Sequence, residues 1–142
     1  MSITNVVPYF RTVMNSLGHR EWTDAFNDDD IPRTVLDRSY HIELGALAND
    51  KQNQDLIEVV QSVAVKLYVK GFRNTADGRD KSAQYMDAII KKALEDDRRA
   101  QSYAGVKNVR LVGGDIGELS TDNDNAMRVT INFNCHLIMA NS

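Results

Sequence analysis

The stretch that decides the fold is NAMRVTINFNCHLIMAN, residues 125–141. Apolar side chains stand at every second position from Met127 to Met139, and polar ones fill most of the positions between them. Such alternation is typical of a β-strand with one face on a core and the other face polar. The stretch is also long, because strands in globular proteins average about 5–6 residues. We therefore predict a long terminal strand over residues 125–141.

Two further stretches, residues 38–47 and 56–72, show the same alternation. The second is rich in valine, which favours strand over helix. Gln61 falls among its apolar positions, so we expect a bulge or an exposed end near it. Between the two stretches, residues 49–54 (NDKQNQ) are polar and without periodicity, which predicts a loop. Together they predict an antiparallel hairpin with a long polar connection.

A shorter strand is predicted over residues 106–112, with Val109 and Leu111 as core candidates. Gly113-Gly114-Asp115 follows as a turn or bulge. It lacks the spacing and the following helix start of a phosphate-binding loop, so we assign the glycines to backbone geometry. Residues 121–125 (TDNDN) form a polar hairpin loop into the terminal strand.

Two helices are predicted. Apolar residues recur at helical spacing over residues 2–17, with Gly18 at a typical helix stop and Pro8 marking a start further in. An amphipathic membrane or partner helix is the weaker interpretation, because the polar face carries little positive charge. The second helix covers residues 81–99, after a turn-rich link (73–79) from which Asp77 or Asp80 caps it.

The predicted order is helix, strand, strand, helix, strand, strand. This order indicates an α+β fold: a mainly antiparallel four-stranded sheet with two principal helices packed on it. The length of 142 residues suits a single domain over residues 1–142.

Composition narrows the function classes. The net charge of -3 argues against a general nucleic-acid binder, and the single Cys135 excludes an internal disulfide and a cysteine-based zinc site. No apolar run approaches the ~20 residues that span a bilayer, and the N-terminus lacks the features of a signal peptide. We expect a protein that stays in the cytoplasm of the cell that makes it.

No catalytic constellation stands out. The histidines, His19, His41 and His136, lack metal-ligand spacing on a helix, and Cys135 and His136 point to opposite faces of one strand. The acidic run at residues 28–30 lacks the central Gly and distal Glu of a calcium loop, so we predict a solvated loop. We predict no enzyme, no metal and no cofactor. Carboxylates that meet in space remain the enzyme alternative.

The order of elements, together with Gly114-Asp115-Ile116 leading through a polar loop into a long alternating strand, resembles the tail terminator (tail completion, minor tail protein U-like) proteins of long-tailed bacteriophages. The resemblance covers nearly the whole chain and rests on order, length and pattern. It implies a homo-hexameric ring that caps the tail tube and joins it to the head. The implied partners are the chain itself, the tail tube protein and the head–tail connector protein.

The resemblance also implies a virion location without a membrane, and DNA that passes through the ring without specific binding. By analogy, two polar loops are candidate docking surfaces. Their residues are Asn49, Asp50, Lys51 and Gln52 in one loop, and Thr121, Asp122, Asn123 and Asp124 in the other. A mildly acidic chain agrees with a ring that does not grip phosphates.

The polar face of the terminal strand is a second candidate surface. Arg128, Thr130, Asn132 and Asn134 are mostly small or uncharged, whereas a free monomer tends to protect exposed sheet surfaces with charge. They predict a contact with another subunit, with an ordinary solvent face as the alternative. The alternative function is a small α+β module that binds a protein or ligand as a dimer.

Overall fold

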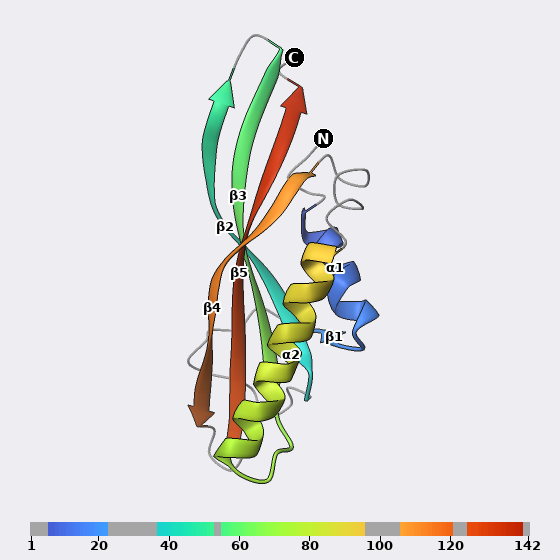
Figure 1. The fold of residues 1–142 in the computed structure, drawn as a ribbon, viewed down its shortest axis with the longest axis vertical. Coiled ribbons are helices and arrows are strands. Elements are labelled where there is room, and N and C mark those ends of the chain that lie inside the picture. The colour runs from blue at the N-terminus through green and yellow to red at the C-terminus, as the bar shows by residue number, and fades with distance from the viewer. Residues whose placement is uncertain (1–5, 23–36, 53–54, 96–105, 121–124, 141–142) are drawn as a thin grey trace.

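The computed structural model describes residues 6–22, 37–52, 55–95, 106–120 and 125–140 (Figure 1). Two helices and five strands form one α+β unit. In chain order they are α1 (Val6–Ser16), β1 (Arg20–Glu21), β2 (Ser39–Gln52), β3 (Leu56–Val69), α2 (Thr75–Glu95), β4 (Val106–Ser120) and β5 (Asn125–Ala140).

The five strands lie in the order β1-β2-β3-β5-β4. β2, β3, β5 and β4 pair antiparallel, as predicted, whereas β1 runs parallel to β2. The predicted four-stranded sheet and its order of elements are therefore incomplete, because β1 lies between α1 and β2 and makes the sheet mixed. A strand of two residues has no periodicity for a sequence pattern to reveal.

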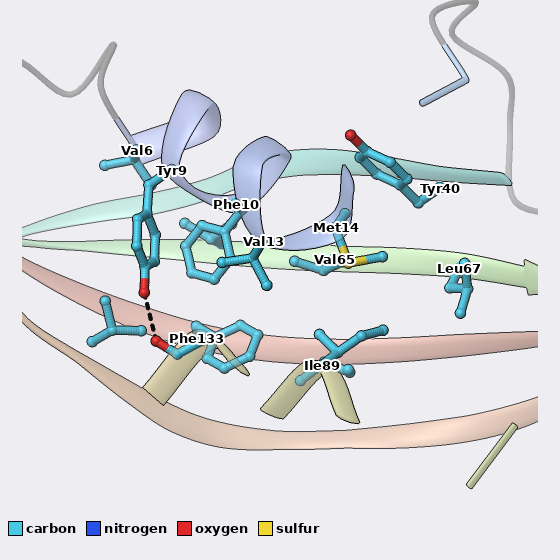
Figure 2. Packing of buried hydrophobic residues seen from close by; sticks show 14 of the residues in the cluster. Val6, Tyr9, Phe10, Val13, Met14, Tyr40, Val65, Leu67, Ile89 and Phe133 are labelled. Atoms are coloured by element: carbon cyan, nitrogen blue, oxygen red, sulfur yellow. Dashed lines mark hydrogen bonds between the residues drawn. The ribbon is translucent and has the colours of Figure 1, made fainter. Parts of the chain in front are cut away.

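Both helices pack on the same face of the sheet (Figure 1). β3 and β5 bring their alternating apolar residues to that face, and all of these are buried from Val63 to Leu67 and from Val129 to Phe133. In Figure 2, Phe10 and Val13 of α1 point onto these strands, and the Phe10 and Phe133 rings lie 5.0 Å apart between centroids. The predicted core face of the terminal strand is confirmed.

The first helix spans Val6–Ser16, and its predicted start at residue 2 lies outside the described residues. Pro8 lies in its first turn, where the missing N–H leaves no helical bond unmade. Gly18 ends the helix, as predicted: its φ is 83°, and the N–H of His19 returns to the Met14 carbonyl at 3.1 Å. Tyr9 donates a hydrogen bond to the carbonyl of Ala93, which ties α1 to α2 (Figure 2).

The second helix begins at Thr75, so most of the predicted link over residues 73–79 is helical. The cap is Asn74, whose Oδ1 accepts the Asp77 N–H at 2.9 Å. Asp77 itself accepts the N–H of Arg73 at 3.1 Å. Gly78 is buried in the helix, and the Phe72 ring covers the place where a Cβ would stand. The last described residue of α2 is Glu95, and the predicted end lies beyond the described residues.

The β2–β3 hairpin is longer than predicted. β2 continues through Gln52, so residues 49–52 are strand and not loop. The expected irregularity near Gln61 is confirmed as a bulge in β2, where the register shifts between Leu44 and Leu47. Gln61 is buried, and its amide donates to the carbonyl of Gly45 across this bulge at 3.0 Å.

β4 also exceeds its predicted length of residues 106–112, reaching Ser120. The glycine stretch forms a bulge within it, with a register shift between Leu111 and Gly113, so the predicted turn is wrong and the predicted bulge is confirmed. At Gly114 the two strands approach closely, because a Cβ there would collide with the carbonyl oxygen of Thr130 on β5.

Gly114→Ala is expected to lower the free energy of unfolding by about 1–3 kcal/mol, because a backbone oxygen cannot yield as a flexible side chain does. Gly117→Ala on the same strand is the matched control, since nothing lies within 4 Å of a Cβ at Gly117. Chemical denaturation measures both variants. Equal stability of the two would show that β4 and β5 do not approach as described.

Candidate assembly surfaces

The four predicted interface residues of β5 share the face that the helices leave uncovered. Arg128, Thr130 and Asn134 are half-buried, and Asn132 is exposed. Across the β3–β5 ladder they pair with Tyr68, Lys66, Ala64 and Ser62. Their predicted placement on one face is confirmed, and their role in assembly stays a prediction.

Polar contacts organise part of this uncovered face. Lys66, only 8% exposed, lies 3.1 Å from the carboxylate of Glu43, which also contacts His41 at 2.9 Å. Partial burial alone would raise the pKa of Glu43, but the hydrogen bonds from His41 and Lys66 outweigh it and hold that pKa below its usual value. The His41 ring stacks on buried Tyr68. This end of the face is thus largely engaged within the subunit.

Asn132 is the accessible member of the predicted set. Asn134 accepts a hydrogen bond from Ser62 at 3.2 Å, whereas the Asn132 side chain stands exposed beside Ala64 of β3 and Gly113 of β4. A contact of this face with another subunit would therefore centre on Asn132.

The first candidate docking segment is the end of a strand. Asn49, Asp50, Lys51 and Gln52 form the last residues of β2, and the Asn49 side chain donates to that of Gln52 at 3.3 Å. In Figure 1 this end of the β2–β3 hairpin extends past both helices, and its role in docking stays a prediction. The second candidate segment, Thr121 to Asp124, lies outside the described residues.

The two outer strands form a surface that the sequence pattern did not separate from the core. β1 covers β2 only at Ser39 and Tyr40, and within the described residues no strand lies beyond the rest of β2 or beyond β4. Four of the exposed large hydrophobic residues lie on these strands: Leu44, Leu47, Leu111 and Val112. Leu111, predicted as a core residue, is 43% exposed, because its strand is at the edge.

Leu44 and Leu111 occupy the same row of the sheet. Leu44 pairs with Val63, Val63 pairs with Phe133, and Phe133 pairs with Leu111. Because directly paired residues share a face, both leucines lie on the side of the helices, at opposite ends of a row whose centre is buried.

The described residues bring together no group of three His, Cys, Asp or Glu side chains that could hold a metal ion. Cys135 is buried beside Gln61 on the core face, as predicted, while His136 lies half-buried on the other. No helix in the described part of the chain is long and apolar enough to cross a membrane.

A partly buried cluster joins the end of α1 to the sheet. Arg38, with a φ of 67°, donates to the Leu17 carbonyl at 2.6 Å and to Nδ1 of His19 at 3.3 Å. Its guanidinium lies over the Tyr85 ring, and the His19 ring meets the same tyrosine edge-on. These contacts hold two elements in place, and we assign the cluster to structure.

Comparison with known proteins leaves the function to be argued from this geometry: no protein-family model matches the chain, and no curated protein does either.

Proposed function

We propose that this protein is a structural virion protein, a tail terminator that forms a ring at the end of a phage tail tube and joins the tube to the head. The proposal rests on the resemblance in element order and length, together with one observation. In the described part of the chain, no strand lies beyond β4 or beyond most of β2, and both strands expose leucines.

Open edges are unusual because unpaired N–H and C=O groups invite pairing with another chain, and monomeric proteins protect them with charge, proline or short strands. Here β2 and β4 span 14 and 15 residues and contain no proline. Each strand carries exposed charged residues and a bulge, yet each also exposes leucine near its middle. Such a subunit can accept a second copy on each side. Contacts on two different edges generate a ring when the rotation closes.

In the proposed assembly the chain contacts itself as a homo-hexamer, the tail tube protein and the head–tail connector protein, and it performs no catalysis. The projecting β2–β3 tip, with Asn49 and Gln52 exposed, is a candidate contact with one of these neighbours. DNA passes through without specific binding, which agrees with a net charge of -3.

A dimeric binding module is the second candidate, because an open edge can also pair with its own two-fold copy. That arrangement closes after two subunits and leaves one edge of each subunit uncovered.

Light scattering over a concentration series tests the proposal. We expect a species with six times the 16.0 kDa mass of one chain, alone or in equilibrium with monomer, and rings with a central hole in electron micrographs. A dimer at every concentration would favour the binding module. A monomer at every concentration would contradict self-assembly without the tail tube.

A further inference from the structure

Both outer strands carry an exposed leucine on the same row and the same face of the sheet. Leu44 on β2 is 45% exposed and Leu111 on β4 is 43% exposed. The chain of registers through Val63 and Phe133 sets them level with one another. At this row, therefore, both edges of the sheet present an exposed leucine on the face of the helices.

We infer that copies of this chain associate head-to-tail through these edges, with β4 of one copy pairing antiparallel with β2 of the next and Leu111 opposite Leu44. This inference deepens the proposed ring and rests on it. β2, β3, β5 and β4 alternate in direction, so β2 and β4 run in opposite senses. A neighbour in the same orientation therefore continues the antiparallel sheet along β2 from His41 onward, because β1 occupies the edge of β2 at Ser39 and Tyr40.

The charges along the two edges suit this register. Glu43 precedes Leu44 on β2, and Arg110 precedes Leu111 on β4; both are exposed. In the paired edges they become diagonal neighbours on the uncovered face, about 7–8 Å apart between Cα atoms, within reach of their long side chains. Gly113 lies on the row of Glu43 and offers no side chain to obstruct the pair.

The carboxylate of Glu43 already contacts His41 and Lys66, but its two oxygens have capacity for a further donor. Two rows beyond Glu43 and Gly113, Asp115 of one copy comes level with His41 of the next copy. No like charges face each other at that row. The edges are thus complementary in both apolar and charged positions.

Head-to-tail association with a second copy accounts for the exposed hydrophobic residues on both edges of the sheet. A two-fold pairing of β2 with β2 would bury Leu44 but leave Leu111 and Val112 exposed, and a pairing of β4 with β4 would do the reverse. Head-to-tail pairing covers all of these residues in every copy except at a free end, and a closed ring has no free end.

Disulfide cross-linking of the full chain tests the pairing. Directly opposite residues of an antiparallel pair have Cα atoms about 4.5–5.5 Å apart, which suits a disulfide. We would make Leu44→Cys, Leu111→Cys and the double variant, and oxidise each with diamide at an assembling concentration. The native Cys135 is fully buried and stays in all three.

The double variant should form a ladder of covalent species beyond dimer on a non-reducing gel, and each single variant should stay monomeric on it. Covalent dimers from a single variant would overturn the inference in favour of two-fold pairing. The absence of a ladder, at a concentration where scattering shows a ring, would overturn the edge pairing and leave the ring intact. Failure to assemble at all would contradict both the edge pairing and the self-assembly of the ring without the tail tube.

Charge substitutions give a second readout that does not depend on thiol geometry. Leu44→Lys and Leu111→Lys should each shift the scattering mass to monomer, whereas Leu94→Lys should not, because Leu94 is a similarly exposed leucine on α2. If Asn132→Lys on the uncovered face removes the assembly and the edge variants do not, the contact lies on the face and the inference is wrong.

Discussion

Phe133→Ala is expected to lower the free energy of unfolding by about 3–5 kcal/mol, the usual cost of emptying a buried aromatic site. Phe133 is fully buried at the centre of β5, the strand that holds β3 on one side and β4 on the other. Its ring packs on that of Phe10, so the cavity would open between the sheet and α1. Neither a strand ladder nor an amphipathic helix can shift far to refill it.

Leu111→Ala is the matched control, because Leu111 lies opposite Phe133 in the same row but is 43% exposed. In the monomer it should change the free energy of unfolding by no more than about 0.5 kcal/mol. Urea denaturation measures the stability of both variants at a protein concentration too low for assembly. A large loss from Leu111→Ala, or a small one from Phe133→Ala, would mean that the core is not where the structure places it.

The row of residues that contains Phe133 shows which features of the fold can be predicted from the sequence. Alternation predicts an apolar side for each strand, and the structure brings the apolar residues Leu44, Val63, Phe133 and Leu111 to one face of the sheet. Alternation is a property of a single strand, so it carries no information on which strands lie outermost. Only the strand order separates the two central positions, which are buried, from the two terminal ones, which are exposed.

The predicted start of α2 is wrong for a different reason. Gly78 and the polar residues around it predict a turn, so the sequence predicts a start of α2 that is too late. In the folded chain the glycine is required, since the Phe72 ring occupies the space of its Cβ, and Asn74 supplies the cap. That contact depends on how Phe72 returns over the helix, which local composition does not encode.

The polar face of β5 was also predicted only in part. The polar residues of β5 were found from their alternation, and Asn132 remains accessible. The burial of Lys66 and its contact with Glu43 depend on register between strands, so they were not foreseen. The edge leucines were visible in the sequence, but only as ordinary members of an apolar pattern.

The stability of the fold is expected to decrease between pH 6.5 and pH 4.5 through one side chain, His19. The pKa of His19 is lowered to about 4, first by burial and then by the nearby charge of Arg38, while Asp37 opposes the shift. In the unfolded chain the imidazole titrates near 6.5. Between these two pKa values the unfolded chain binds the proton more strongly than the folded chain does. The contribution of His19 to stability is therefore fully present above pH 6.5 and is lost as the pH falls towards 4.

The size of the effect follows from the two pKa values. The free energy of unfolding should be about 2.5 kcal/mol lower at pH 4.5 than at neutral pH. The geometry at His19 agrees with this direction, because Nδ1 accepts a hydrogen bond from Arg38, which a protonated nitrogen cannot do. Glu43, whose pKa is lowered from 4.5, loses its contribution only below that pH, so the two effects separate.

Denaturation at pH 7.5 and pH 4.5 measures the difference, with His19→Asn as the matched variant because its side chain retains an oxygen acceptor and does not titrate. The variant should lose most of the pH dependence in this interval. Wild-type protein that is equally stable at both pH values would show that His19 is open to water, and the cluster of Arg38 and Tyr85 would then not hold α1 against the sheet as described.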